Sequence, residues 1–296
     1  MTFKKFISAS LLSVALVFNS YASEIPSKEQ VEKVLKPIIP NGKVVEVNET
    51  PIQNIYEIVV EVNNRYYPFY IDKSLKYLIS GPVVDIEGRR NLTQERAQEL
   101  QRRASREKFA QLSQLLGVKK AEKLLTILSQ RDYRIVDMPE VPKNVIVEGN
   151  PYGSKVVYVI TDPECPFCKR FNDEIKKLVQ MDRSVKVVEI LYPLPFHSYA
   201  KGVSSAVLCQ SNKDKAKKLL NKAFDYQQDK TVLGEIAQKS CQTGNEILKS
   251  HKEFAEKVGL RGTPSIIIPL KNGKALFISG GFDAKTLKRL LDIIYQ

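Results

Sequence analysis

Two of the four cysteines in this chain are separated by only two residues, in the run Cys165-Pro166-Phe167-Cys168. A continuous apolar stretch precedes the run and apolar residues at helical spacing follow it, so Cys165 is predicted to lie between a buried strand and a helix. Unpaired N–H groups and the helix dipole favour an anion there, which lowers the thiol pKa below ~8.5. Cys168, one turn further on, can displace a thiol bound to Cys165. The pair predicts thiol–disulfide exchange, with Cys165 as nucleophile and Cys168 as resolving thiol.

Two other roles for this pair are half of a structural zinc site and an inert disulfide. A structural zinc site needs four ligands, which usually come as two close pairs. The sequence contains no second close pair of cysteines, so zinc is disfavoured. Disulfide exchange itself needs no cofactor, and we expect neither a metal nor a cofactor.

The other two cysteines, Cys209 and Cys241, lie far apart in segments with helical patterning. A structural disulfide between them is favoured, and closing a loop of this length could stabilise the fold by ~3–4 kcal/mol. A second redox pair is disfavoured because neither cysteine lies at a predicted helix start.

Four titratable residues are candidates for tuning the pair or for acid–base chemistry. Asp162 and Glu164 flank the nucleophile, and they either raise its pKa through like charge or only make the strand end more soluble. His197 follows a predicted strand, and His251 lies in a lysine-rich helical segment. We expect both histidines to be surface residues, because disulfide exchange requires no general base.

The N-terminus has the composition of a secretory signal peptide. Lys4 and Lys5 precede an apolar run over residues 6–18, and small residues follow up to Ala22. The run is shorter than the roughly 20 residues that span a bilayer. We expect removal of residues 1–22 and export of a soluble protein to an oxidising compartment, where an even number of cysteines favours disulfides.

The net charge of +13 raises the question of a nucleic-acid partner. About half of the excess comes from residues 89–134, where twelve Lys or Arg face five Asp or Glu. This stretch has the pattern of a long exposed helix, whose charges are normally solvated. With an export signal and no nucleic-acid motif, we expect no nucleic-acid partner.

The mature chain begins with a small α+β unit, residues 23–90. A capping box at 27–30 opens a short helix, and strands are predicted near 44–47, 55–62, 65–71 and 77–79, with a turn at Asn63-Asn64. A unit of this size has a marginal core, and its exposed sheet edge invites pairing with a second copy.

Residues 91–143 are predicted to be a helical linker. A helical pattern runs from residue 93 to about 130 with a stop at Gly117, and Pro139 and Pro142 follow. Residues 144–296 read as an α/β domain. Its strands are predicted at 155–160, 185–191, 265–268 and 275–278, with a helical insertion at about 198–258 and a last helix capped by Asp283.

Several motifs resemble those of known proteins. The run from Thr161 to Cys168 after a hydrophobic strand, with Gly262-Thr263-Pro264 before another strand, resembles the thioredoxin superfamily. The helical insertion that contains Cys209 and Cys241, together with a small N-terminal domain and a linker helix, resembles the DsbC/DsbG-type periplasmic disulfide isomerases. The resemblance covers essentially the whole mature chain.

The resemblance implies a thioredoxin fold with a helical insertion, joined by a helical linker to a cystatin-like dimerisation domain. Pro264 would be the cis-proline that faces the redox pair, and Thr263 would offer backbone groups to an extended substrate. The resemblance also implies a periplasmic homodimer. Its partners would be misoxidised exported proteins and a membrane thiol reductase of the DsbD type, which donates electrons.

The chain departs from the family in two places. The pair encloses Pro-Phe, whereas the commonest isomerase pair encloses Gly-Tyr, and Val159 stands where thioredoxin has a buried acid. Our leading hypothesis is a periplasmic disulfide isomerase. The alternatives are a DsbG-like reductase of sulfenylated cysteines and a chaperone (holdase) that acts without thiols.

Overall fold

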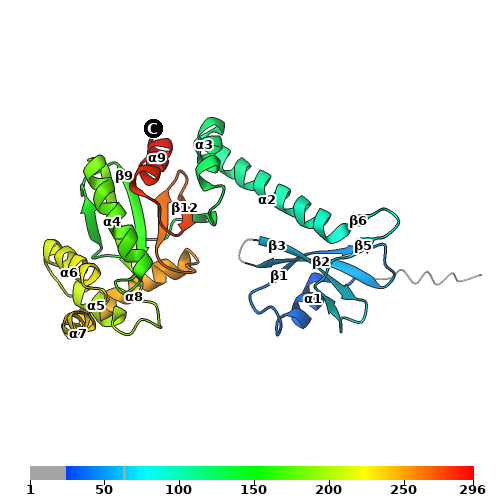
Figure 1. Ribbon diagram of the computed structural model, residues 1–296, viewed down its shortest axis with the longest axis horizontal. Coiled ribbons are helices and arrows are strands. Elements are labelled where there is room, and N and C mark those ends of the chain that lie inside the picture. The colour runs from blue at the N-terminus through cyan, green and yellow to red at the C-terminus, as the bar shows by residue number, and fades with distance from the viewer. Residues whose placement is uncertain (1–24, 63–64) are drawn as a thin grey trace, which may run out of the picture. The chain divides into compact units, whose positions relative to one another are not determined.

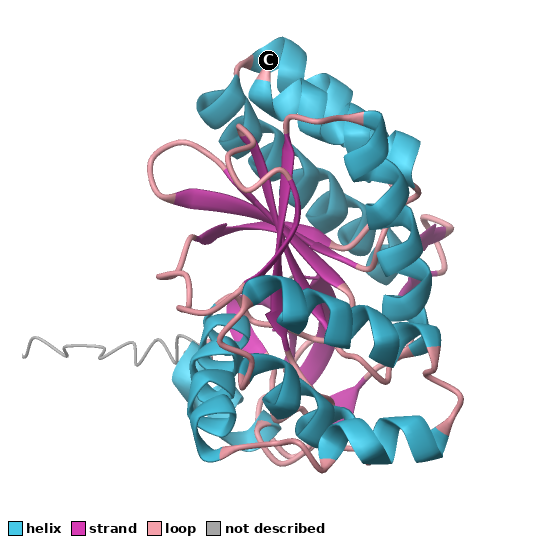
Figure 2. Ribbon diagram, turned by 90° about the vertical axis from the view of Figure 1, so that its left-hand side faces the viewer, coloured by secondary structure: helices cyan, strands magenta, loops and turns pink. Residues whose placement is uncertain are grey.

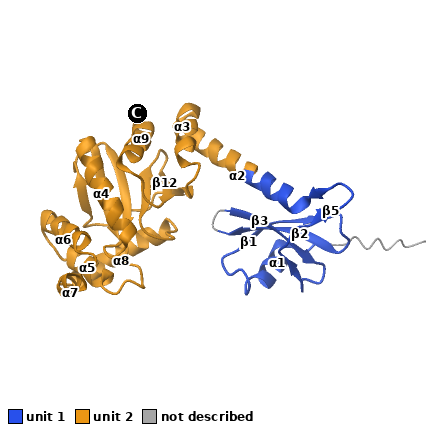
Figure 3. Ribbon diagram, viewed as in Figure 1, with its two compact units in different colours: residues 1–101 blue, residues 102–296 orange. Residues whose placement is uncertain are grey.

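The computed structural model describes residues 25–62 and 65–296. The chain divides into two compact units, residues 1–101 and 102–296, which are described separately (Figure 3). The predicted signal peptide, residues 1–22, and the predicted turn at Asn63-Asn64 lie outside the described residues. No described helix is long and apolar enough to cross a membrane.

The first unit packs a helix on a four-stranded antiparallel sheet (Figure 1). Helix α1 (Lys28–Leu35) opens with the predicted capping box, in which Ser27 and Gln30 exchange hydrogen bonds between side chain and backbone. The sheet has the order β1-β2-β3-β4, with β1 (Lys43–Glu49), β2 (Ile55–Val62), β3 (Arg65–Asp72) and β4 (Leu78–Ile79). The core joins Val31 and Leu35 of the helix to sheet residues Val44, Tyr56, Ile58, Val60 and Ile71.

A short ribbon of β5 (Val84–Asp85) and β6 (Arg90–Asn91) leads into helix α2 (Leu92–Leu116). Gly117 separates α2 from α3 (Val118–Leu128), and its φ of +88° lies in the region that favours glycine. The helical pattern predicted from residue 93 to about 130, with its interruption at Gly117, is confirmed.

Part of the basic charge at the start of α2 and in β6 is neutralised within the first unit. The guanidinium of Arg96 bonds to the carboxylates of Glu57 (2.9 Å), Glu99 (2.8 Å) and Glu46. Arg90 likewise pairs with Glu95 at 2.5 Å. Two of the twelve basic residues in the stretch 89–134 therefore have acidic partners in these contacts.

The second unit is built on a six-stranded mixed sheet in the order β7-β12-β11-β9-β10-β8. Strands β9 and β10 run parallel, and the other neighbours run antiparallel. The strands are β7 (Tyr133–Asp137), β8 (Ile146–Gly149), β9 (Lys155–Thr161), β10 (Val185–Leu191), β11 (Ser265–Pro269) and β12 (Lys274–Ser279).

The two edge strands of this sheet, β7 and β8, were not predicted, and β7 falls within the range predicted to be a helical linker, 91–143. The charge of Arg134 conceals the strand pattern of β7. Its guanidinium is nevertheless buried, because it donates to the carbonyl oxygens of Val258 (2.8 Å) and Gly259 and stacks on Phe277 with its carbon 3.9 Å from the ring centroid. Tertiary partners distant in sequence therefore make β7 a strand.

Helices cover both faces of this sheet (Figure 2). On one face, α3 packs with α4 (Pro166–Met181) and α9 (Ala284–Tyr295) in the largest apolar cluster of the described residues. Helix α9 begins at the predicted cap, where the Asp283 carboxylate accepts a hydrogen bond from the N–H of Thr286 (2.9 Å). On the other face, Phe254 and Ala255 of α8 (Gln242–Lys257) pack on strand residues such as Ile160, Val188 and Ile267.

The segment between β10 and β11 forms four helices, which confirms the helical prediction for about 198–258. They are α5 (Ala200–Leu208), α6 (Lys213–Asp225), α7 (Lys230–Ala237) and α8 (Gln242–Lys257). A disulfide joins Cys209, at the end of α5, to Cys241, the N-cap of α8, across a sequence separation of 32. The covalent link ties the first helix of the insertion to the last.

The expectation that His251 is a surface residue was wrong. The residue is fully buried, and its Nδ1 accepts a hydrogen bond from the backbone N–H of Leu191 (3.0 Å), which connects α8 to β10. Burial lowers the pKa of His251 to about 4, so the imidazole is neutral at pH 7. The lysines around it lie on the solvent face of α8, whereas His251 faces the sheet.

Candidate active site at Cys165 and Cys168

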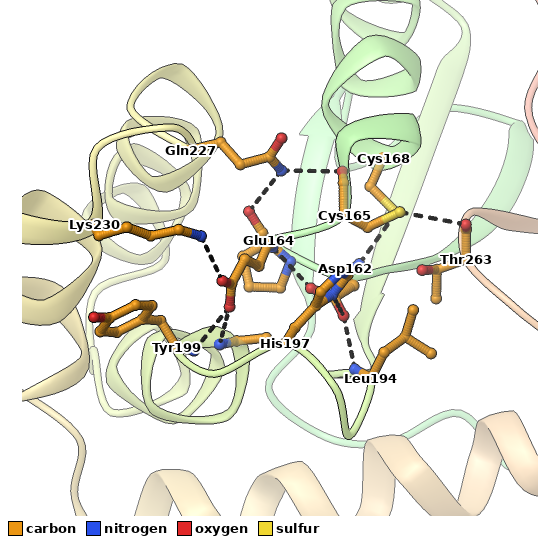
Figure 4. A network of polar contacts seen from close by, with 12 residues as sticks. Asp162, Glu164, Cys165, Cys168, Leu194, His197, Tyr199, Gln227, Lys230 and Thr263 are labelled. Atoms are coloured by element: carbon orange, nitrogen blue, oxygen red, sulfur yellow. Dashed lines mark hydrogen bonds and ion pairs between the residues drawn. The ribbon is translucent and has the colours of Figure 1, made fainter.

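The two closely spaced cysteines lie where β9 ends and α4 begins (Figure 4). Cys165 is the N-cap of α4, and Pro166 follows in the first helical position, where an N–H would have no partner in the helix. The carbonyl oxygen of Cys165 accepts hydrogen bonds from the N–H groups of Cys168 (3.0 Å) and Lys169 (3.1 Å). Helix α4 therefore starts where the sequence predicts it. Both thiols are free.

The environments of the two sulfur atoms differ. A hydrogen bond with the Cys168 side chain, with help from the backbone N–H of Cys168, lowers the pKa of Cys165 to about 5, although burial opposes ionisation. The Cys168 side chain is 1% exposed, and this burial raises its pKa well above the usual value. At neutral pH, Cys165 is consequently a thiolate and Cys168 a thiol.

Thr263, which precedes Pro264, lies beside this pair. The peptide bond between Thr263 and Pro264 is cis. The Sγ of Cys165 lies 3.6 Å from the carbonyl oxygen of Thr263, 98 residues away in sequence. The fold thus places the backbone of this loop beside the Sγ of Cys165, a residue that is itself 4% exposed.

Asp162 is fully buried beneath the loop, which excludes a role as a solubilising charge. Its carboxylate accepts hydrogen bonds from the backbone N–H of Glu164 (2.7 Å), the N–H of Leu194 (2.7 Å) and Nδ1 of His197 (2.8 Å). Its own N–H donates to the Sγ of Cys168 at 3.4 Å. His197 is thus held in the site by its contact with Asp162, which corrects the expectation of a simple surface residue.

Glu164 is also buried, and it connects the loop to the helical insertion. Burial opposes its ionisation, but a hydrogen bond from Lys230 (2.8 Å), together with the N–H groups of Tyr199 (2.8 Å) and Ala200 (3.0 Å), lowers its pKa. The charge of Glu164 is therefore compensated by partners within the fold. The burial of Glu164 excludes the solubilising role considered from the sequence.

Gln227, between α6 and α7, is a residue that sequence reasoning missed. Its Nε2 donates to the carbonyl oxygens of Pro163 (3.0 Å) and Cys165 (3.0 Å), and the side chain is buried. Because Gln227 lies more than sixty positions from both partners, no local pattern could have connected them. Together with Glu164, Gln227 fastens the helical insertion to the loop that carries the nucleophile.

A third buried acid, Glu189, lies on β10 beside Val159 of β9 and is 2% exposed. Burial and the nearby charge of Glu148 raise the pKa of Glu189 to about 8. The sequence places no acid at Val159, but the fold puts one on the adjacent strand. A glutamate within the apolar run 185–191 was the one signal that could have identified it.

Glu148 belongs to a polar network that reaches α4. Its carboxylate pairs with Lys217 (2.6 Å) and accepts a hydrogen bond from Asn221 (3.2 Å). Asn221 in turn accepts one from Asn172 (3.2 Å), which lies one helical turn beyond Cys168. Buried polar groups therefore extend from β8 to the helix that carries the redox pair.

Glu189→Gln should stabilise the reduced protein at neutral pH. Below pH 4.5 the carboxyl is protonated in both states; above it, only the unfolded state releases the proton until the pH passes about 8. The stability from this group is thus full below pH 4.5, falls progressively as the pH rises, and is fully lost above about pH 8. Urea unfolding should show a gain on the order of 2–3 kcal/mol at pH 7 and little change at pH 4.

Glu253→Gln, on the exposed face of α8, is the matched control and should not alter the pH dependence. Identical stability profiles for the wild type and Glu189→Gln would contradict the assignment of a buried, protonated Glu189.

The thiolate of Cys165 should persist well into the acid range. We expect thiolate absorbance of the reduced protein to disappear with a midpoint near pH 5, because the hydrogen bond from Cys168 stabilises the anion. Cys168→Ala removes that donor and should move the midpoint upward. A single midpoint above pH 8 in the wild type would contradict the geometry described above.

Among residues 25–62 and 65–296, no group of three or more His, Cys, Asp or Glu side chains could hold a metal ion.

Two family models match the chain. A thioredoxin-like domain matches residues 143–294, about half of the sequence, and the N-terminal domain of disulfide bond isomerase proteins matches residues 22–94. A comparison with curated proteins found no match.

Solved structures similar to this chain include three bacterial proteins. One is a periplasmic thioredoxin-like protein from Salmonella enterica serovar Typhimurium (21% identity, 52% of this chain and 91% of that chain, TM-score 0.43). Another is Pseudomonas aeruginosa DsbA2 (21% identity, 52% and 96%, TM-score 0.43). The third is Proteus mirabilis ScsC in a transitional conformation (20% identity, 67% and 96%, TM-score 0.44).

Proposed function

Because the chain belongs to the thioredoxin-like family of thiol–disulfide oxidoreductases and has a DsbC-type N-terminal domain, we propose that it rearranges wrong disulfides in exported proteins. One observation carries the proposal. A thiolate at a helix start, Cys165, lies beside a buried thiol, Cys168, and beside the backbone of Thr263. This asymmetry suits a nucleophile that attacks first and a resolving thiol that acts only afterwards.

The first step is attack by the Cys165 thiolate on one sulfur of a substrate disulfide. A bond forms between the Sγ of Cys165 and that sulfur, the substrate S–S bond breaks, and the other substrate sulfur leaves as a thiolate. The backbone N–H of Asp162 and the hydrogen bonds from Gln227 hold the loop during this exchange.

The mixed disulfide then has two fates. In isomerisation, another substrate thiolate attacks the mixed disulfide, a new substrate disulfide forms, and Cys165 leaves as a thiolate with no net oxidation. In reduction, Cys168 loses its proton and attacks Cys165, which releases a substrate thiol and leaves the Cys165–Cys168 pair oxidised. A two-electron thiol reductant must then restore the pair, and a membrane thiol reductase of the DsbD type fits that role.

The proposal places the protein in the periplasm as a homodimer joined through its N-terminal domains. Four exposed apolar side chains within residues 77–86 of the first unit support this assembly. Exposed apolar residues that cluster in this way are typical of a surface that a partner covers. The four are Tyr77, Ile79, Val84 and Ile86, with exposed fractions of 41–87%.

Sedimentation equilibrium of residues 23–296 should therefore give twice the monomer mass. Val84→Asp/Ile86→Asp should give a monomer, because charges at a buried interface are costly. Ile52→Asp, at an exposed apolar residue outside this stretch, is the matched control and should remain dimeric. A wild-type monomer at micromolar concentration would overturn the dimer proposal.

The catalytic proposal is tested by refolding a scrambled multi-disulfide protein with catalytic amounts of the reduced chain. We expect recovery of native disulfides to be faster than with a small thiol at the same concentration. If only sulfenylated cysteines are reduced, the DsbG-like alternative holds. If only aggregation is suppressed, with or without the two cysteines, the holdase alternative holds.

A further inference from the structure

A groove of about 760 Å³ lies beside the redox pair, entirely within the second unit. Its apolar surface comes from Phe167, which lies between the two cysteines, and from Phe282. Thr263-Pro264 forms one wall, and Gly280-Gly281 forms another with little side-chain bulk. Gly281 allows the wall to approach closely, because a Cβ there would lie 2.6 Å from the ring of Phe171.

The acidic residues of the groove already have partners. Asp132 pairs with Arg261 at 3.3 Å and accepts a hydrogen bond from Ser279. Glu174 pairs with Lys177 at 2.5 Å and accepts a hydrogen bond from the N–H of Ala284. The third, Asp283, is bonded to Thr286 as the cap of α9. Each of these carboxylates therefore already pairs with a cation or accepts hydrogen bonds from the protein itself.

Two arginines of the groove have no carboxylate partner among residues 25–62 and 65–296. The guanidinium of Arg131 lies over the ring of Phe282, with its carbon 4.4 Å from the centroid, and that of Arg170 lies over Phe167 at 4.6 Å. Stacking on a ring uses the face of a guanidinium and leaves its N–H edge for an acceptor. The groove thus presents two positioned cations at its apolar surface.

We propose that this groove binds the polypeptide segment next to the substrate cysteine and prefers segments that carry aspartate or glutamate. The occupant must be the chain that becomes linked to Cys165, because the groove is continuous with Thr263, whose carbonyl oxygen lies 3.6 Å from that sulfur. Arg131 and Arg170 then bind its carboxylates, while its apolar atoms contact the two phenylalanines. This assignment rests on the proposed function and adds a substrate class to it.

The test uses two peptides that differ only in charge. Each has one cysteine activated as a mixed disulfide with 2-thiopyridine, flanked on both sides by aspartate in one peptide and asparagine in the other. Stopped-flow release of pyridine-2-thione gives the rate constant for attack by the reduced full chain. We expect the aspartate peptide to react about tenfold faster, since each arginine offers a charge-assisted hydrogen bond.

Arg131→Gln/Arg170→Gln should reduce this preference to within about twofold. Lys249→Gln/Lys252→Gln removes the same charge from the exposed face of α8 and should retain the preference. The uncharged reagent 2,2′-dithiodipyridine reports on Cys165 alone. Its rate should be the same in the wild type and in Lys249→Gln/Lys252→Gln, and in each protein it serves to normalise the two peptide rates.

Equal rates for both peptides, with normal reaction of dithiodipyridine, would overturn the groove assignment and leave the proposed function intact. A preference that survives in the double arginine variant would overturn it as well. Failure of the wild type to react with any of the three reagents would overturn the proposed function itself.

Discussion

Cys165→Ala is expected to lower the rate of disulfide exchange by about three orders of magnitude or more, because the thiolate is the attacking group. Burial raises the pKa of the remaining thiol, Cys168, well above its usual value, so it is protonated at neutral pH and cannot replace the nucleophile. Refolding of a scrambled protein and reduction of a model disulfide should both fall to the uncatalysed rate. Retention of more than a few per cent of either activity would contradict the assignment of Cys165.

Cys168→Ala is the matched variant, with the same loss of one thiol from the same helix. It retains the nucleophile, and it should form mixed disulfides with substrates that persist because no second thiol resolves them. Non-reducing electrophoresis should detect these adducts in Cys168→Ala and not in Cys165→Ala. The opposite distribution of adducts would exchange the two roles.

Loss of the disulfide between Cys209 and Cys241 is expected to lower the free energy of unfolding of the second unit by about 3–4 kcal/mol. The disulfide spans 32 positions and joins α5 to α8. Its removal increases the conformational entropy of the unfolded chain over this segment. Cys209→Ser/Cys241→Ser should show the loss in urea unfolding. This variant and the reference protein that retains Cys209 and Cys241 should both carry Cys165→Ala/Cys168→Ala. The two proteins then differ in only one pair of cysteines.

Dithiothreitol provides the control for this experiment. It should destabilise the protein that retains Cys209 and Cys241 by a similar amount, and it should not affect the protein that lacks them. A second effect should follow from the contacts of the insertion with the active-site loop through Glu164 and Gln227. This effect is measured in a Cys209→Ser/Cys241→Ser variant that retains Cys165 and Cys168. As urea unfolds the insertion, thiolate absorbance of Cys165 should disappear at a lower urea concentration in this variant than in the wild type. Equal unfolding midpoints in all conditions would mean that the link contributes nothing to stability.

Local patterns were sufficient for the elements whose causes are local. The capping box at Ser27, the stop at Gly117 and the cap at Asp283 each act within one helical turn, and all three stand where the sequence predicts them. The start of α4 at Cys165 is of the same kind, since Pro166 and the apolar repeat that follows act over neighbouring residues. For this reason the sequence alone identifies the candidate nucleophile and predicts its low pKa.

Contacts between distant residues decided the rest. Asp162 and Glu164 looked like exposed charges, yet both are buried because backbone N–H groups and Lys230, 32 to 66 positions away, satisfy their carboxylates. Burial of His251 and of Glu189 likewise depends on which face of α8 and of β10 meets the core. A side chain's charge state follows from its neighbours in space, and these neighbours exist only once the sheet and the insertion have packed together.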